Sequence, residues 1–416
     1  MKKLILSASS LFILAAQVTA QEPSINVNTG YKTTEPTTIK SNAKNKNVTY
    51  SYTVSDANNG VNVKYGDRTQ EVQDDSPFKA KTFTKSFSIN RGDKINLSNQ
   101  YGSITIKTWD KNEIKVDADI KAYAKTENEA QKLIDDVSIT ANRSGDVVSY
   151  KTEMGDRNGN WGSSVRNGKT IWRREVKTHY IVYMPASNAL TVLQQYGNIV
   201  MGDFSGPTSI KVQYGNLTAG NLSNANNYIS IQYGKGSVKD MGGATIKHQY
   251  GGGTTIGNIA GSLDLNAQYT SVNIASVNGV ATIKHQYGGG TTIGTVSGAM
   301  NVNTQYAPIK INTLKGNFTT RAQYGKVLID NIEAGRDVDV DAQYSTVSLG
   351  FASNYAADFD VRTHYGSFKY GANVNARREG GDDRGYSSSK SYSGQIGRGG
   401  SAKVFVKLQY NTVTFK

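Results

Sequence analysis

Aliphatic and polar residues alternate in short runs along most of this chain, and the runs themselves repeat. Between residues 191 and 374 nearly every run ends in Gln-Tyr, and successive tyrosines lie 17 to 21 residues apart. The segment ATIKHQYGGGTTIG occurs twice, at 244–257 and 281–294. A period this short, with strand-type alternation and no helical pattern, is typical of a β-solenoid in which each repeat forms one coil.

Alternation within a coil predicts which side chains face the core. The residue four positions before the tyrosine is aliphatic in nine of ten repeats, as at Ile246 and Ile283, and the next residue is mostly polar, as at Lys247 and Lys284. Neighbouring side chains of a strand point to opposite faces, so the isoleucines should be buried and the lysines exposed. The same parity predicts that the tyrosines stack inside the core and that the glutamines before them form an outer ladder. The pattern slips by one residue after Tyr-Gly, where we expect the glycine to turn the chain.

The predicted fold is all-β: a single-stranded parallel β-helix or β-solenoid with about 18–19 residues per coil, preceded by a small α+β cap containing one helix. The helix signal is the capping box Thr126-x-x-Glu129, followed by an apolar face. We expect six segments: a signal peptide (1–20), a polar β-rich leader (21–81), the cap with a helix at about 126–137 (82–190), the repeats (191–374), a flexible Gly/Ser/Arg-rich insertion (375–400) and a terminal coil (401–416).

The N-terminus predicts export. Lys2 and Lys3 precede an apolar stretch from Leu4 to Val18, and the small residues before Ala20 are typical of a signal-peptide cleavage site. We therefore expect the mature protein in the periplasm, on the outer-membrane surface or outside the cell, without an integral membrane segment. The chain has no cysteine, which excludes disulfides and thiolate metal sites.

The positive charge lies mainly at the two ends of the repeats. The chain has 47 Lys and Arg against 33 Asp and Glu, a net charge of +14, and residues 151–177 and 377–416 carry much of the excess. For an exported protein this favours an anionic envelope polymer, a glycan or another envelope protein as partner, and not nucleic acid. The alternative is that these charges only keep a β-rich protein soluble. We also expect residues 376–400 to be dispensable for folding.

The candidate interaction surface combines the glutamine ladder with the basic C-terminal insertion. As alternatives, the glutamines only stabilise neighbouring coils through their amides, or the tyrosines form an aromatic platform for sugars. The candidate residues are Gln213, Gln232, Gln249, Gln268, Gln286, Gln305, Gln323, Arg377, Arg378, Arg384 and Arg398.

No catalytic, cofactor-binding or metal-binding residues are predicted. His248 and His285 occupy the same coil position two coils apart, about 9.6 Å, which is too far for one metal ion. Asp337, Asp339 and Asp341 alternate along one strand, but a calcium site needs more oxygen ligands. We therefore interpret these carboxylates as solvated.

The order of these parts resembles a bacterial putative-adhesin family of otherwise unknown function, widespread in the Bacteroidetes group. The resemblance depends on Gln100-Tyr101-Gly102-Ser103-Ile104, Thr108-Trp109-Asp110-Lys111, the helix Glu129 to Val137, Met184-Pro185 and the Tyr-Gly coils. It implies an adhesin, and the family offers no established catalytic or binding residues. The resulting hypothesis is an exported, non-catalytic β-solenoid of the cell envelope that is an adhesin or an interaction or structural protein. The alternative is a polysaccharide-active β-helix lyase or hydrolase, which would need acid and base groups that converge on one groove.

Overall fold

The computed structural model describes residues 74–155, 160–379 and 388–416. The chain divides into a unit of residues 1–69, outside the described residues, and a unit of residues 70–416, to which all that follows refers. The described residues are all-β with a single helix, and this helix is too short to cross a membrane. The predicted signal peptide and most of the predicted leader lie outside the described residues.

A region of mixed parallel and antiparallel strands with one helix begins the described unit. Its elements are β1 (Phe78–Ser88), β2 (Lys94–Gln100), β3 (Gly102–Thr108), β4 (Glu113–Tyr123), α1 (Glu127–Asp135), β5 (Val137–Ser144), β6 (Val147–Met154), β7 (Gly162–Arg166) and β8 (Lys169–Met184). Strand β4 lies between β1 and β8, antiparallel to both. The hydroxyl of Thr126 accepts a hydrogen bond from the Glu129 amide at 3.2 Å, which confirms the predicted helix start. Ala130, Leu133 and Ile134 are the buried helix face.

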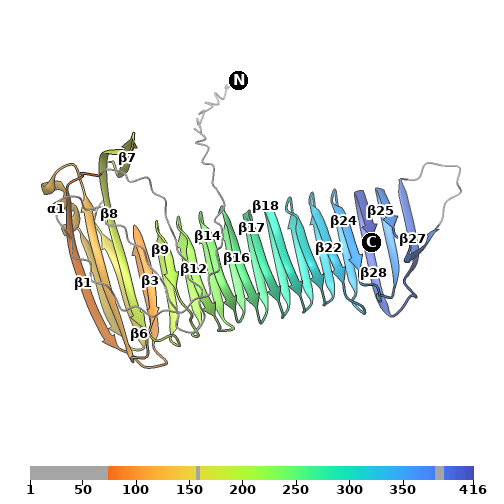
Figure 1. The fold of residues 1–416 in the computed structure, drawn as a ribbon, viewed down its shortest axis with the longest axis horizontal. Coiled ribbons are helices and arrows are strands. Elements are labelled where there is room, and N and C mark those ends of the chain that lie inside the picture. The colour runs from red at the N-terminus through yellow and green to blue at the C-terminus, as the bar shows by residue number, and fades with distance from the viewer. Residues whose placement is uncertain (1–73, 156–159, 380–387) are drawn as a thin grey trace, which may run out of the picture. The chain divides into compact units, whose positions relative to one another are not determined.

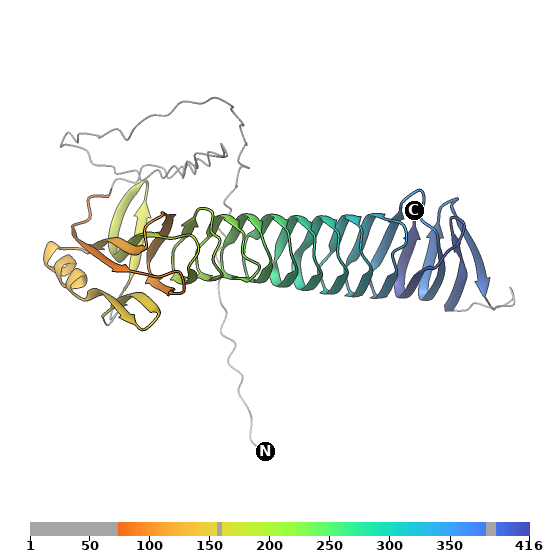
Figure 2. The same ribbon diagram turned by 90° about the horizontal axis from the view of Figure 1, so that it is seen from below.

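Each repeat then adds one strand to each of two parallel ladders (Figures 1 and 2). The first ladder contains β9 (Ala189–Gln195), β11 (Thr208–Gln213), β13 (Asn227–Gln232), β15 (Ala244–Gln249), β19 (Met300–Gln305), β21 (Phe318–Gln323) and β23 (Val338–Gln343). The second contains β10 (Ile199–Met201), β12 (Leu217–Leu222), β14 (Lys235–Met241), β16 (Gly253–Ile259), β20 (Ile309–Leu314), β22 (Lys326–Ile332) and β24 (Thr346–Phe351). The long strands β17 (Leu263–Val277) and β18 (Ala281–Val296) belong to both.

Equivalent residues of successive repeats pair in register, so the inward rows form a continuous core. Ile246 pairs with Ile229 on one side and Leu265 on the other, and all three are buried. Ile283 is buried in the same way, whereas Lys247 and Lys284 are exposed. The predicted alternation of core and surface residues is therefore confirmed for these positions.

The order of the last repeats in space differs from their order in the sequence. Strand β25 (Ala357–Tyr370) follows β24 in the chain, but β28 (Ala402–Phe415) lies between them. It pairs in parallel with β23 and β24 on one side and with β25 on the other (Figure 1). Residues 401–416 were expected to form the terminal coil, and they form the penultimate one. Because all coils share one pattern, the sequence does not specify which neighbour a coil selects.

The insertion predicted at 375–400 is not a flexible loop in its described part. It contributes β26 (Val374–Glu379) and β27 (Ser389–Ile396). Strand β27 pairs antiparallel with β25 and with β26. It therefore satisfies backbone groups of β25 that would otherwise form an open sheet edge. The expectation that residues 376–400 are dispensable for folding stays a prediction, which the loss of these pairings in a deletion variant would test.

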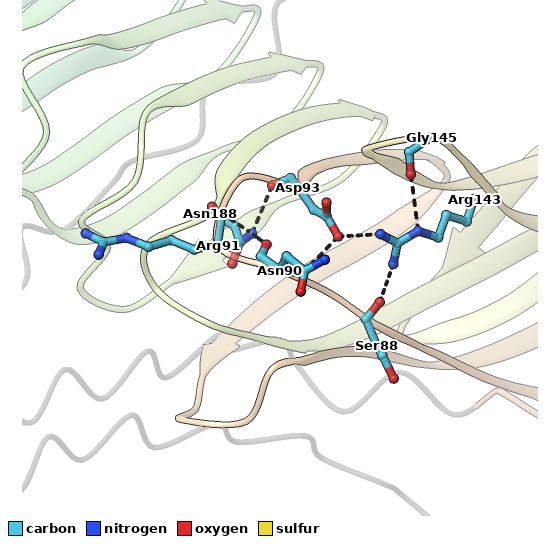
Figure 3. Close-up of polar contacts among 7 residues, drawn as sticks. All are labelled: Ser88, Asn90, Arg91, Asp93, Arg143, Gly145 and Asn188. Atoms are coloured by element: carbon cyan, nitrogen blue, oxygen red, sulfur yellow. Dashed lines mark hydrogen bonds and ion pairs between the residues drawn. The ribbon is translucent and has the colours of Figure 1, made fainter.

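A buried polar cluster joins the N-terminal region to the first repeat (Figure 3). The side-chain amide of Asn188 donates hydrogen bonds to the carbonyls of Asn90 and Asp93 at 2.7 and 2.9 Å. The Asp93 carboxylate, 5% exposed, pairs with the Arg143 guanidinium at 2.7 Å. Arg143 also donates to the carbonyl of Ser88. The Asn188 amide thus links the loop between β1 and β2 to the residue before β9, whereas the Asp93–Arg143 pair, with Arg143 32% exposed, lies within the N-terminal region.

Candidate functional site: a column of exposed tyrosines

Twelve tyrosines, one at each corner between the two ladders, form a continuous column of stacked rings. Neighbouring ring centroids lie 4.5–5.3 Å apart, and the ring planes differ by 1–14°. In spatial order the column consists of Tyr101, Tyr196, Tyr214, Tyr233, Tyr250, Tyr269, Tyr287, Tyr306, Tyr324, Tyr344, Tyr410 and Tyr365. Ten of them are 37–50% exposed. The prediction that these rings lie in the core is therefore wrong.

The backbone conformation of the tyrosines explains the error. All twelve have φ between 50° and 58°, the left-handed region. Strict alternation of faces holds only for an extended backbone. A left-handed residue interrupts this alternation, so the ring stays outside and the next strand starts in the opposite phase. The one-residue slip in the sequence is the signal of this conformation, which belongs to the tyrosine and not to the glycine.

The glycine after the tyrosine has a different role, which is close approach of the backbones. A Cβ atom at Gly215 would lie 1.8 Å from the carbonyl oxygen of Gly197, and one at Gly234 would lie 1.7 Å from that of Gly215. Neither distance is compatible with a side chain. Thr270 and Ala307 occur in place of this glycine after Tyr269 and Tyr306, and their side chains are buried. The corners are therefore of two kinds, one with a glycine in close backbone contact and one with a buried side chain.

The predicted glutamine ladder is present beside the column. The side-chain amide of Gln195 donates to the carbonyl of Gln213 at 3.1 Å, and Gln213 donates to Gln232 at 3.0 Å. The same bond links Gln249 to Gln268 at 2.7 Å, and it continues to Gln286 and Gln305. The glutamines therefore stabilise neighbouring coils, and their partial exposure leaves polar groups at the edge of the tyrosine column.

The predicted arginines lie at the C-terminal end, on other elements than the glutamines. Arg377 and Arg378 are exposed on β26, and Arg398 is exposed after β27. Arg384 lies outside the described residues. The structure thus gives the candidate surface two separate parts.

Stacking does not by itself explain why tyrosine occurs at every corner. A left-handed backbone costs a residue other than glycine about 1–2 kcal/mol. A stacked aromatic pair contributes about 0.5–1.5 kcal/mol beyond the area that it buries. These two terms roughly offset each other, and the covered half of each ring adds about 2.5 kcal/mol of apolar burial. Tyrosine is therefore favoured over asparagine in the packed column in spite of the backbone strain, and the other half of each ring remains exposed.

The column exposes ring edges and hydroxyl groups and covers the ring faces. Each interior ring has a tyrosine on both sides, so a sugar cannot stack on its face. The neighbours also affect the hydroxyls: desolvation, followed by the hydroxyl of Tyr410, raises the pKa of Tyr344. The surface is therefore a long strip that is apolar at the ring edges and polar at the hydroxyls and amides. This geometry suits lateral contact with an extended partner.

His248 and His285 are buried groups of the core. His248 is fully buried and its Nδ1 atom lies 2.8 Å from the Thr254 hydroxyl. His285 makes the equivalent contact with Thr291 at 2.8 Å. Burial lowers the pKa of both imidazoles below 6.5, so they are neutral at pH 7. Within the described ranges no three His, Cys, Asp or Glu residues are grouped as metal ligands.

Comparison with known proteins finds structures of low sequence identity and no matching family. No family model and no curated protein matches the chain. Among solved structures, one of a "putative cell adhesion protein" from Clostridium sporogenes is 11% identical and covers 81% of this chain and 99% of its own, with a TM-score of 0.18. A "putative adhesin" from Parabacteroides merdae is 10% identical (64% and 95% covered, TM-score 0.30). A "putative lipid binding protein" from Parabacteroides distasonis is 12% identical (64% and 95% covered, TM-score 0.26). At these TM-scores the likeness carries no functional argument.

Proposed function

We propose that this chain is an exported, non-catalytic β-solenoid of the cell envelope, which binds an extended partner in the manner of an adhesin. Its contact surface is the tyrosine column together with the glutamine ladder. The observation that carries the proposal is the column itself, a continuous strip of half-exposed tyrosines that all have a left-handed backbone. Strain of this kind concentrates at functional positions, and tyrosine is enriched in binding surfaces.

Two further features support this proposal. The two parallel ladders, with one strand per repeat in each, support the solenoid interpretation. Export depends on the signal peptide at residues 1–20, and mass spectrometry of the native protein should then find a chain that begins at Gln21. A retained Met1 in the envelope fraction would contradict export.

The partner that fits the strip best is a linear envelope polysaccharide. Its sugar rings offer apolar C–H groups and hydroxyls in regular alternation, which match the tyrosine edges and the glutamine amides. Arg377, Arg378 and Arg398 add positive charge at the C-terminal end of the column. An anionic polymer such as lipopolysaccharide would therefore bind in a salt-sensitive manner.

The test removes the middle of the column without changing the backbone. The triple variant Tyr250→Asn, Tyr269→Asn, Tyr287→Asn introduces asparagine, which tolerates the left-handed conformation. The matched control, Thr245→Asn with Thr282→Asn, changes exposed residues on the same coils away from the column. The assay measures retention of the mature protein on immobilised lipopolysaccharide and on peptidoglycan. For the triple variant, retention on one of these polymers should fall at least about tenfold, and for the control it should not fall.

Circular dichroism must show that both variants remain folded, and if the triple variant does not, the single variant Tyr269→Asn replaces it in the same assay. Equal retention of the triple variant and the control would mean that the column is not the contact surface. Release of new reducing ends from either polymer would contradict the non-catalytic assignment and favour the polysaccharide-active enzyme.

A further inference from the structure

Near the C-terminal end, the outer face of the first ladder departs from the repeat pattern at several positions that adjoin one another. Phe405 occupies a row that is otherwise mostly small and polar, and His364 replaces the ladder glutamine. Arg321 and Asp341 follow one another in a row that carries Asn, Ser or Lys in most other repeats, and Lys407 is next to Asp341 in this row. All five residues line one cavity of about 790 Å³.

The insertion of β28 creates this arrangement. In the strand register Phe405 lies between Asp339 of β23 and Asp360 of β25. One step along the strands, Lys407 lies between Asp341 and Arg362. An aromatic ring is thus flanked by carboxylates, with cations beside it. If β25 followed β23 directly, as in the sequence, neither Phe405 nor Lys407 would be in this place.

Several of these side chains have unused hydrogen-bonding capacity. Arg362 is held by two bonds to the Asp360 carboxylate, at 3.0 and 2.9 Å, and its guanidinium carbon lies 5.4 Å from the centroid of the Phe405 ring. By contrast, no hydrogen bond or ion pair to another described residue engages the side chains of four lining residues. These are Arg321, Asp339, Asp341 and Lys407.

We propose that this cavity binds a short acidic oligosaccharide. The volume lies within the range of small-molecule sites, about 300–1,000 Å³. The Phe405 ring offers an apolar surface for a sugar ring, and Asp339 and Asp341 can accept hydrogen bonds from sugar hydroxyls. Because Asp360 pairs with Arg362, the cavity keeps three other cations (Arg321, Lys390 and Lys407) against two carboxylates, an excess that favours a carboxylated or sulfated sugar over a neutral one.

This proposal goes beyond the adhesive strip because the cavity uses none of the column tyrosines. The test is isothermal titration of the mature protein with tetragalacturonate, its methyl ester and a heparin tetrasaccharide. At least one acidic probe should bind, and removal of the charge by esterification should weaken tetragalacturonate binding at least about tenfold. The triple tyrosine variant should bind as the wild type does, which separates this site from the proposed adhesive function.

The variants restore the residue types of the other repeats, and we therefore expect them to fold. Phe405→Thr should weaken binding at least about tenfold. The control Tyr228→Thr changes an aromatic residue of the same row that lies between Ser209 and Thr245, and it should have no effect. Lys407→Asn should weaken binding and lower its salt dependence, which gives a second test if Phe405→Thr does not fold.

The proposal is overturned if neither acidic probe binds, or if folded Phe405→Thr and Lys407→Asn bind as tightly as the wild type. Equal binding of tetragalacturonate and its methyl ester would overturn the preference for an acidic ligand.

Discussion

Replacing Tyr269, near the middle of the column, separates the strain of the left-handed backbone from the gain of stacking. Its φ is 51° and its ring is 49% exposed. The rings of Tyr250 and Tyr287 lie 5.1 and 4.9 Å from it. Asparagine tolerates this backbone because its short side chain bonds locally, whereas β-branched valine does not. The informative comparison is therefore Tyr269→Asn against Tyr269→Val.

The expected magnitudes follow from these contacts. Both variants lose two stacked pairs, together about 1–3 kcal/mol. They also lose about 100 Å² of buried aromatic surface, half of a tyrosine side chain, which contributes about 2.5 kcal/mol. Asparagine relieves about 1–2 kcal/mol of backbone strain, so Tyr269→Asn should destabilise the protein by about 2–4 kcal/mol. Valine relieves none of this strain, so Tyr269→Val should destabilise the protein by at least about 1 kcal/mol more than Tyr269→Asn.

The assay is urea denaturation of the mature protein, followed by far-ultraviolet circular dichroism. Thr282→Val, an exposed β-branched substitution within a strand, controls for valine itself and should change stability by less than about 0.5 kcal/mol. If the asparagine and valine variants unfold at the same urea concentration, the tyrosine backbone is not strained and the assigned balance between strain and stacking is wrong.

Three further predictions concern the core. Gly215→Ala should lower the free energy of unfolding by more than about 3 kcal/mol in urea denaturation, because the new Cβ would lie 1.8 Å from a backbone oxygen. Ala307→Gly, at an equivalent corner with room for a methyl group, should lower it by only about 1–2 kcal/mol. Ile246→Asp should cost at least about 3 kcal/mol and Lys247→Asp under about 0.5 kcal/mol, and equal losses would contradict the assigned faces. Burial lowers the pKa of His248, so the unfolded state binds more protons and the free energy of unfolding should fall as the pH drops through 6.5, by about 1.4 kcal/mol per unit of pKa depression. His248→Asn should flatten this profile between about pH 7 and 5, and an unchanged slope would exclude His248 as its source.

The periodic part of the structure is predictable from the residue pattern alone. Strand alternation assigned Ile246 to the core and Lys247 to the surface, and the capping box placed the start of α1 at Thr126. The stacked amides of Gln213 and Gln232 were also predictable. These features depend on residues close together in the chain or on exact repetition, so local geometry is enough to derive them.

Tertiary structure decided the features that carry the functional proposals. Whether Tyr269 points inward or outward depends on one backbone angle, and alternation cannot reveal it because the slip fits either the tyrosine or the glycine. The position of β28 depends on a choice among coils with the same pattern, which only long-range pairing resolves. The cavity around Phe405 follows from that choice, since it gathers residues from strands that are not consecutive in the chain.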